Sequence, residues 1–285
     1  MQVLNNFDLT DYNAYQLKAQ CTVAYFPDTE NDLIKIFSEN TQAKKILLGG
    51  GNNIILSKAY YDEQFIIFNN CFNKVEINNT EIIAQAGATT LQINNVALEN
   101  ELTGFEIFYD IPSSIGGAVV MNAGTKVKEI KDILEKVRYI DLQDMQIKEL
   151  LNKDIGFEYR NSFFQKHRDK VVLKAWFKLK QGNYNTIKKI MENEKNTRWD
   201  KQPRNFPNCG SVFKRPKGHY VGQMIEELGL KGFSIGGAKI SEKHAGFIIN
   251  YNNATGKDIL DLIGFIQKKV KNVYNVDLEI EQRVI

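Results

Sequence analysis

The sequence predicts a mixed α/β protein that folds as two or three closely apposed domains. Its 285 residues are too many for a single small core. Short apolar runs typical of buried strands alternate along the chain with segments of helical periodicity. Apolar residues make up 43% of the chain and charged residues 25%, which is the usual balance of a soluble globular protein.

Composition also excludes several classes of protein. No run approaches the ~20 apolar residues that a membrane span needs, and the first residues lack the basic and apolar regions of a signal peptide. We therefore expect a cytoplasmic protein with no membrane partner. Cys21, Cys71 and Cys209 are widely spaced, so they predict neither a disulfide framework nor a zinc site, and no metal is expected. The formal net charge of +3 is too small to indicate a nucleic-acid partner.

Strands are expected on both sides of a glycine-rich loop and again in the middle of the chain. Asn78 and Asn79 have the composition of a hairpin turn. The segments with the apolar runs or alternation of strands are 43–50, 63–70, the two arms of a hairpin within 75–88, 137–142, 171–180 and the terminal 276–285.

Helices are expected in four segments, which are 89–104, 184–199, 219–232 and 256–276. Thr89 or Thr90 can cap the first helix and Gly104 can end it. The third helix has a glycine stop at Gly229 or Gly232. Two of the five prolines fall within the sequence DKQPRNFPNCG, which predicts a linker or domain boundary near residues 202–208.

The first stretch that could carry chemistry is LLGGGNNIILS, residues 47–57. A strand is expected after the glycines, and this disfavours a Rossmann dinucleotide site, which needs a helix N-terminus there. Successive N–H groups free of side chains can still converge on a phosphate, with Asn52 and Asn53 as further donors. The alternative is a tight turn that needs positive φ, for which one glycine is enough.

The second stretch is FYDIPSSIGGAVVMNAG, residues 108–124. It is largely uncharged and holds two clusters of small residues: Ser113, Ser114, Gly116, Gly117, Ala118, Ala123 and Gly124. Such a segment can lie flat against a large planar ligand and offer it backbone groups. A close crossing of two backbone segments in a core would explain one glycine pair, but not two clusters.

The third and fourth stretches are FEYRNSFF, residues 157–164, and NCGSVFKRP, residues 208–216. Arg160 stands among aromatic residues, where a guanidinium is costly unless it meets a carboxylate or phosphate. An arginine at a strand edge can also make an ordinary surface ion pair. Ser211 follows a glycine on a loop, but the G-x-S-x-G elbow of serine hydrolases is absent, so a hydrolase is disfavoured.

Together these stretches resemble one family. LLGGGNNIILS is similar to its LGGGSNLL loop, IPSSIGGAVVMNAG to IPGTVGGAVxMNAG, and FEYRNSFF to YRxSxF. NCGSVFKRP is similar to AGSxFKNP, IEELGLKG…GGAKISEKHAGFIIN to IExxGLKG…GGAxVSxxHxNFIVN, and LEIEQRV to LExEVR. The six blocks occur in the family's order from residue 46 onward. The family is that of the UDP-N-acetylenolpyruvoylglucosamine reductases, or UDP-N-acetylmuramate dehydrogenases, and the short chain resembles its compact branch.

The resemblance implies an α+β protein with the FAD-binding fold of the vanillyl-alcohol-oxidase (PCMH-type) class. Two α/β subdomains are expected to bind FAD, over residues 1–60 and 61–201, with the terminal strand 276–285 returning to the first. Residues 202–275 are expected to form an α+β substrate-binding domain. The resemblance also implies NADPH as reductant, UDP-N-acetylglucosamine enolpyruvate as substrate, and a monomer.

The resemblance also assigns site residues. Arg160, Ser211 and Glu281 match catalytic positions of the family. Arg160 would stabilise the enediolate-like charge that hydride addition creates, Ser211 would protonate C2, and Glu281 would assist with a pKa raised by burial. The positions implied to bind the cofactor are Gly49, Gly50, Gly51, Asn52, Asn53, Ile111, Pro112, Ser113, Ser114, Gly116, Gly117, Ala118, Asn122, Ala123, Gly124 and Tyr159. Cys209 and His244 are expected to be packed structural residues.

The sequence departs from the family pattern in several places. The RxGGPA turn near the N-terminus and the AYG after MNAG are missing, DIPSS replaces GIPGT, and FKRP replaces FKNP. Asp110 adds a charge near the expected cofactor. These departures leave open a paralogue that acts on another unsaturated nucleotide sugar. An FAD oxidase of the same fold and a non-catalytic nucleotide-sugar binding protein are further alternatives.

Overall fold

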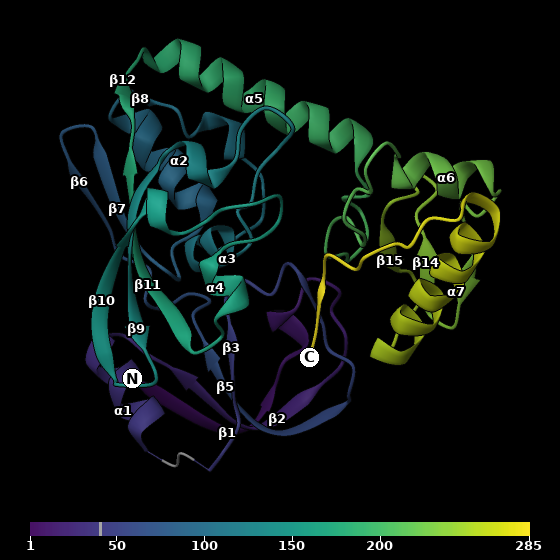
Figure 1. Cartoon of the computed structure of the whole chain (residues 1–285), viewed down its shortest axis with the longest axis horizontal. Helices are drawn as coiled ribbons and strands as arrows, with labels where there is room; N and C mark the ends of the chain where they lie inside the picture. Colours follow the sequence, from purple (N-terminus) through teal and green to yellow (C-terminus); the bar gives the residue numbers. More distant parts are fainter. Residues whose placement is uncertain (40–41) are drawn as a thin grey trace. The chain divides into compact units, whose positions relative to one another are not determined.

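The computed structural model describes residues 1–39 and 42–285 (Figure 1). The chain divides into two compact units. Unit 1 consists of Met1–Leu4, Val23–Gly50 and Glu63–Asn196. Unit 2 consists of Asn5–Thr22, Gly51–Asp62 and Thr197–Ile285. The division at residues 60, 201 and 275 that the resemblance implies stays a prediction.

A four-stranded sheet has the order β1-β2-β5-β3. Its strands are β1 (Gln2–Asp8), β2 (Gln20–Phe26), β3 (Lys45–Leu48) and β5 (Tyr60–Ile67), and along the chain β1, β2 and β5 each run from one unit into the other. Within unit 1, β3 pairs in parallel with β5, with Leu48 opposite Ile67. Helix α1 (Glu30–Ser38) follows β2 and begins with a capping box made by Thr29 and Asp32. The strands predicted on both sides of the glycine loop are confirmed.

The main sheet of unit 1 has the strand order β10-β9-β11-β7-β6, and all its neighbours are antiparallel. The strands are β6 (Val75–Asn78), β7 (Glu81–Gln85), β9 (Leu134–Asp141), β10 (Gln146–Leu151) and β11 (Lys170–Lys178). The predicted hairpin is confirmed, because β6 and β7 pair around Asn79, whose φ is 55°.

Helix α2 (Thr90–Glu99) begins as predicted, with Thr89 as its capping residue. The predicted end at Gly104 is wrong. The helix stops at Glu99 because Leu102, which is 1% exposed, is buried in a short strand, β8 (Leu102–Thr103). This strand pairs with β12 (Lys180–Gln181). The long polar helix predicted after β12 is confirmed as α5 (Tyr184–Lys201).

Two short helices of unit 1 are not predicted by the sequence patterns. They are α3 (Ile115–Val120) and α4 (Phe163–Lys166). Four 3₁₀ turns complete the helical elements of the described residues: Thr10–Tyr12, Glu106–Phe108, Ile130–Asp132 and Asn152–Asp154. Helix α3 is too short for a hydrophobic period to be read, which is why the segment appears in the sequence as a run of small residues.

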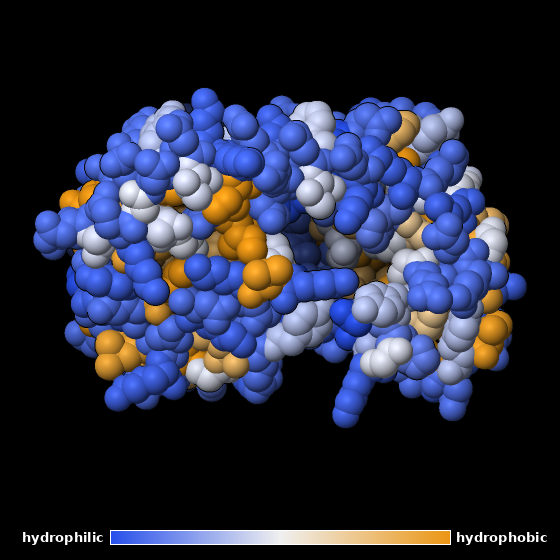
Figure 2. All heavy atoms as spheres, turned by 90° about the horizontal axis from the view of Figure 1, so that it is seen from above, coloured by the Kyte–Doolittle hydropathy of each residue, from blue (hydrophilic) through white to orange (hydrophobic). Residues whose placement is uncertain are grey.

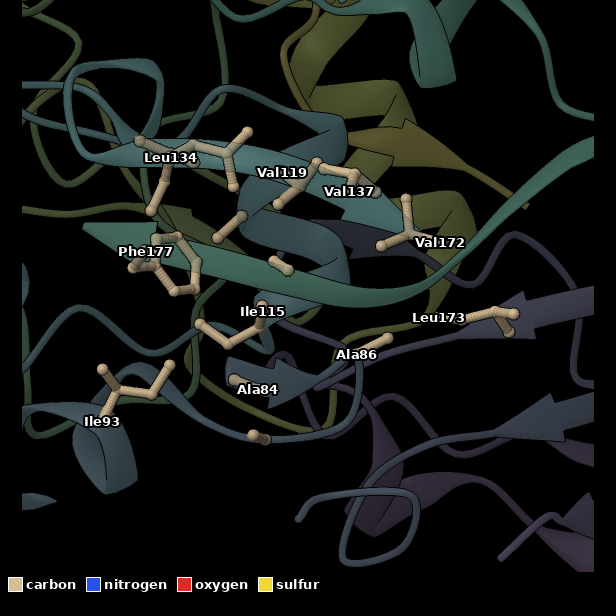
Figure 3. Close-up of a cluster of buried hydrophobic side chains, with 14 of the residues drawn as sticks. Ala84, Ala86, Ile93, Ile115, Val119, Leu134, Val137, Val172, Leu173 and Phe177 are labelled. Atoms are coloured by element: carbon tan, nitrogen blue, oxygen red, sulfur yellow. The ribbon is translucent and has the colours of Figure 1, made fainter. Parts of the chain in front are cut away.

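The core of unit 1 lies between α3 and the main sheet. Figure 3 shows Ile115 and Val119 of α3 beside Val137 of β9 and Phe177 of β11. All four side chains are 0% exposed. Their burial holds the segment that follows Asp110 in a fixed position on the sheet, and it supplies most of the free energy that keeps so short a helix folded.

Unit 2 contains a three-stranded antiparallel sheet with two helices. The elements are α6 (Val221–Glu227), β13 (Ser234–Ile235), β14 (Ala238–Ile240), β15 (Ile248–Asn250) and α7 (Gly256–Tyr274). Helix α7 starts with a capping box between Thr255 and Asp258, and its buried residues include Ile259, Leu262, Ile263, Ile266 and Val270, which recur at helical spacing. Both helices are confirmed, and Gly229 follows the end of α6 with φ of 68°.

The predicted continuous strand over 276–285 is mostly wrong. Only β16 (Arg283–Val284) is a strand, paired in parallel with β4 (Ile54–Ile55). Residues before it hydrogen-bond singly to the loop after Ser211: Lys214 N donates to Glu279 O at 2.9 Å and Glu281 N to Val212 O at 2.8 Å. The segment is extended as the alternation predicts, but its partners are loops.

Figure 2 shows one face on which hydrophilic residues predominate and hydrophobic residues gather in small groups. No helix among residues 1–39 and 42–285 has both the length and the apolar content needed to cross a bilayer. In the same residues, no group of three or more His, Cys, Asp or Glu side chains is placed to hold a metal ion.

We expect Val119→Ala to lower the free energy of unfolding by about 2 kcal/mol, because it removes two buried carbons and leaves a cavity. Val127→Ala is the matched control, since Val127 is 83% exposed. Urea denaturation followed by circular dichroism measures both. Equal costs for the two variants would contradict the packing of α3 described above.

Candidate active site

The glycine loop meets the small-residue segment within unit 1. A Cβ built on Gly49 would lie 2.3 Å from Ser114 Oγ, so the backbone of Gly49 lies directly against this side chain. Two stretches that the sequence singles out separately are therefore neighbours. A side chain at Gly49 would displace the Ser114 hydroxyl, so the protein's own packing is enough to account for a glycine here.

Gly51, which belongs to unit 2, is a second glycine of the loop at which close packing leaves no room for a side chain. Its φ is 68°, and a Cβ there would lie 2.1 Å from Tyr12 O. Its carbonyl oxygen accepts a hydrogen bond from Ala14 N at 3.0 Å. At Gly49 and Gly51, then, the group that comes too close for a side chain is part of the protein itself, and the count of three glycines is weaker support for a ligand than the sequence suggests.

Ser114 fixes the second stretch. Its Oγ accepts from Gly117 N at 3.3 Å and caps α3. Ile115 N and Gly116 N donate to Ala88 O and Ala86 O, both at 2.8 Å. A Cβ on Gly116 would lie 3.0 Å from Ala86 Cβ, so this glycine allows close packing of the helix on the turn after β7. Pro112 and Gly117 are exposed, so the outer side of the segment carries little bulk.

The side-chain amide of Asn122 makes its hydrogen bonds to other segments of the protein. It is 0% exposed, and its Nδ2 donates to Glu129 Oε2 and Glu158 O, each at 3.0 Å. Its Oδ1 accepts from Lys131 N at 3.2 Å. Gly124 is packed as closely, because a Cβ there would lie 2.4 Å from Lys128 O. What this segment presents to other groups is its backbone carbonyls.

Arg160 binds those carbonyls. Its NH2 donates to Gly124 O at 2.9 Å, its NH1 lies 3.4 Å from Asn122 O, and Glu129 Oε1 is 3.9 Å away. The ring of Tyr159 lies 5.2 Å from its guanidinium carbon. Arg160 does not lie at the strand edge that was one reading of the sequence. It lies in a turn with φ of 52°, a backbone conformation that costs a non-glycine residue about 1 kcal/mol. The structure thus brings the MNAG and FEYR stretches together.

Ser211 lies on a loop of unit 2 whose neighbouring residues face inward. Cys209 and Val212 are buried, and Ser211 between them is exposed. Gly210 has φ of 76°, and its N–H donates to Asn208 Oδ1 at 3.1 Å. Val212 N donates to Gly246 O at 3.1 Å. The loop is fixed on both sides of the serine, and the serine side chain points to solvent.

Glu281 lies next to this loop and to the glycine loop. Its N–H donates to Val212 O, and its carbonyl oxygen accepts from Asn53 Nδ2 at 3.3 Å. Arg283 N then donates to Asn53 O at 2.9 Å. The structure therefore brings Glu281, the Ser211 loop and Asn53 together within unit 2, while Arg160 belongs to unit 1.

Sequence reasoning missed Gln282 and Tyr15. Gln282 is 3% exposed and Tyr15 is 0% exposed, and the Tyr15 hydroxyl donates to Gln282 Oε1 at 3.0 Å. Gln282 Nε2 donates to Cys209 O at 3.1 Å. The signal for Gln282 was present in the alternation of the terminal segment. Consecutive side chains of an extended segment point to opposite faces, so Gln282 faces away from the side of Glu281, and an amide stands at a core position.

Cys209 and His244 are packed residues, as expected from the sequence. Cys209 Sγ donates to Ile54 O at 3.3 Å, and burial raises the pKa of this thiol to about 12. His244 Nδ1 accepts from Gly246 N at 3.1 Å, and its ring packs edge-on against Phe247. Burial lowers the pKa of His244 below its ordinary value, which favours the neutral ring.

Comparison with known proteins identifies the class first. Residues 22–150 match the FAD binding domain family, so the chain is a flavoprotein of that class. Residues 202–285 match the C-terminal domain of UDP-N-acetylenolpyruvoylglucosamine reductase. The structure is similar to the crystal structure of UDP-N-acetylenolpyruvylglucosamine reductase (MurB) from Thermus caldophilus, with a TM-score of 0.83 and 28% identity over 99% of this chain and 98% of that chain.

Proteins with similar sequences identify the family to which the chain belongs. The UDP-N-acetylenolpyruvoylglucosamine reductase of Caldanaerobacter subterraneus subsp. tengcongensis is 42% identical over 98% of this chain and 92% of the relative. That of Francisella tularensis subsp. tularensis is 41% identical over 97% of this chain and 98% of the relative. The chain belongs to the UDP-N-acetylenolpyruvoylglucosamine reductase family. The predicted fold class, an FAD-binding fold followed by a C-terminal domain, is confirmed.

We expect Gly51→Ala to destabilise the protein by about 3 kcal/mol, since strain at positive φ and the clash with Tyr12 O add. Gly218→Ala is the control, because Gly218 also has positive φ but nothing lies within 4 Å of a Cβ placed on it. Its cost should be about 1 kcal/mol. Urea denaturation of both variants decides, and a Gly51→Ala cost no larger than the control would contradict the close approach.

The neutral His244 predicts a loss of stability in acid. Its folded pKa lies below the ordinary 6.5, so below pH 6.5 the unfolded chain binds the proton more readily than the folded one. The contribution is complete above that pH and declines as the pH falls, by at most about 1.4 kcal/mol per pH unit. Urea denaturation between pH 7.5 and 5 should show a shallower decline for His244→Gln than for the wild type. The same decline in both would rule out His244 as a source.

Proposed function

We propose that this chain catalyses the NADPH-dependent reduction of UDP-N-acetylglucosamine enolpyruvate to UDP-N-acetylmuramate, a step of peptidoglycan precursor synthesis, through Arg160, Ser211 and Glu281. Family membership over nearly the whole chain carries the proposal. FAD is the cofactor and NADPH the reductant. The chemistry that bound FAD supplies is the relay of a hydride from NADPH to the substrate double bond.

The residues that we propose to hold FAD are the backbone of 49–53 for the pyrophosphate and the segments 111–118 and 122–124, with Tyr159, for the remainder. The adjacency of Gly49 and Ser114 supports this assignment, because it makes one surface of two of these segments. Pro112 and Gly117 are exposed, and Gly117 has no side chain, so a planar ring can approach the backbone there. Asn122 would contribute through its backbone, since its side-chain amide already has protein partners.

Arg160 is proposed to stabilise the negative charge that develops on the substrate carboxylate. Two of its contacts are backbone carbonyls, which orient the guanidinium without neutralising it, and the carboxylate of Glu129 is at the outer limit of an ion pair at 3.9 Å. A guanidinium held in advance needs no reorganisation when the charge appears.

Ser211 is proposed to give its proton to C2 of the substrate, and Glu281 to assist as a proton-linked carboxyl. The support for Ser211 is its exposed position on a loop fixed from both sides. A serine hydroxyl is a weak acid, so it serves only when it is within hydrogen-bond reach of a strongly basic carbanion. The support for Glu281 is its backbone bond to Val212, the residue after Ser211. We further propose a monomer that works in the cytoplasm.

The test is an anaerobic optical experiment. The flavin absorbance near ~450 nm is bleached with NADPH, and UDP-N-acetylglucosamine enolpyruvate is then added. We expect rapid return of the colour in the wild type. In Ser211→Ala, bleaching should stay within two-fold of the wild-type rate, while the return slows by about 10²–10⁴-fold because the proton donor is lost.

The outcomes separate the parts of the proposal. Bleaching without return in the wild type would move the substrate to another unsaturated nucleotide sugar. Return with oxygen much faster than that of free reduced flavin, with no return on addition of the substrate, would indicate an oxidase. An unchanged return in Ser211→Ala would remove Ser211 as the acid, and a protein that takes up no FAD would overturn the whole assignment.

A further inference from the structure

The buried amide of Gln282 lies against three consecutive carbonyls of the Ser211 loop. Gln282 Nε2 lies 3.1 Å from Cys209 O, 3.3 Å from Gly210 O and 3.5 Å from Ser211 O. Three consecutive carbonyls therefore share the two N–H groups of one side chain. Gln282 is 3% exposed, so water does not compete well for these carbonyls.

Tyr15 fixes the orientation of that amide. Its hydroxyl donates to Gln282 Oε1 at 3.0 Å, which directs the NH₂ group toward the loop. Tyr15 is itself anchored, because its carbonyl oxygen accepts from Asn250 Nδ2 at 2.8 Å and Asn250 N donates to Pro207 O at 2.9 Å. Burial raises the pKa of Tyr15 well above its ordinary value, so the hydroxyl keeps its proton and remains a donor.

The amide of Gln282 adds a restraint from the buried side to the backbone bonds that flank the serine. Gly210 has φ of 76° and nothing lies within 4 Å of a Cβ placed on it, so its immediate surroundings do not fix it sterically. Ser211 is exposed, so packing contributes little to its position, and its backbone forms only an isolated antiparallel bridge with Phe247. A proton donor that is displaced by about 1 Å loses much of its effect. Restraint of the loop from its buried side therefore serves the proposed role of Ser211.

Gln282 also follows Glu281 directly in the chain. Glu281 N donates to Val212 O at 2.8 Å, so the backbone that carries Glu281 pairs with the residue after Ser211. The LExEVR pattern that this segment resembles has valine after the glutamate, a residue that could not bind the three carbonyls. At this position the chain has a polar restraint in place of an apolar side chain.

We propose that Gln282, oriented by Tyr15, is a positioning residue that holds the Cys209–Ser211 loop so that the Ser211 hydroxyl reaches its reaction partner. The inference rests on the proposed role of Ser211. It assigns no contact with substrate or cofactor to Gln282. Its effect is confined to the step in which the serine gives up its proton.

The test compares four variants of the FAD-loaded protein. Gln282→Leu removes the amide, Gln282→Glu keeps its size but removes both N–H donors, and Tyr15→Phe removes one oxygen. Gln267→Leu is the control, since Gln267 Nε2 also donates to a backbone carbonyl of unit 2, Leu278 O at 2.9 Å. Stopped-flow absorbance measures flavin reduction by NADPH and flavin reoxidation by UDP-N-acetylglucosamine enolpyruvate separately.

We expect the limiting rate of reoxidation to fall at least ten-fold in both Gln282 variants and several-fold in Tyr15→Phe. Flavin reduction and the substrate concentration for half-maximal reoxidation should stay within two-fold, and Gln267→Leu should match the wild type. Amide hydrogen exchange of the peptide spanning residues 208–213 should be faster in the Gln282 variants, with exchange in unit 1 unchanged.

The double variant Gln282→Leu with Ser211→Ala identifies the route of the effect. If Gln282 acts through the serine, the double variant is no slower than Ser211→Ala alone. If the reoxidation rate of the double variant falls by the product of the two single effects, the inference is overturned. It is also overturned if Tyr15→Phe and Gln282→Leu are reoxidised at the wild-type rate, or if Gln267→Leu slows reoxidation as much as Gln282→Leu does. If Gln282→Leu fails to retain FAD, Tyr15→Phe and its double variant with Ser211→Ala decide by the same criteria. A wild type that is not reoxidised by the substrate would refute the proposed function instead.

Discussion

The return of the C-terminal segment to the glycine loop is the constraint on which unit 2 depends. Backbone bonds join Arg283 to Asn53 and Ile285 to Ile55, and Glu281 joins Val212. These bonds are few, and no long strand supports them. They nevertheless fix three chemically distinct groups in one place: the loop after β3, the serine loop and the terminal glutamate. Because the partners are far apart in sequence, their alignment forms only when the whole unit has folded.

In unit 1 the equivalent role is played by Asn122. A buried amide with three partners on two segments, 129–131 and Glu158, sets the geometry of the carbonyls that receive Arg160. In each unit a buried side-chain amide thus fixes the backbone near candidate residues, Asn122 in unit 1 and Gln282 in unit 2. Amides suit this task because they can donate and accept at once without bringing a charge into the core.

Much of the fold could be predicted from the sequence, because strong local signals coincide with buried elements. The hairpin at Asn79, the capped start of α2 and helix α7 all have such signals. The end of α2, the short helix α3 and the broken terminal strand could not be predicted, since each is decided by tertiary partners. The resemblance supplied the candidate residues, but the packing reasons for Gly49 and Gly51, and the buried Gln282, required the structure.

The left-handed backbone of Arg160 has a consequence for how this position can change. Glycine or asparagine adopts a φ of 52° with less strain, so selection for stability alone would replace the arginine. A chain that no longer performed the reaction would be expected to drift toward those residues here. Under the proposed role of Arg160, the identity of residue 160 therefore serves as a marker in divergent copies: an arginine kept in spite of its conformational cost indicates selection for a function other than stability.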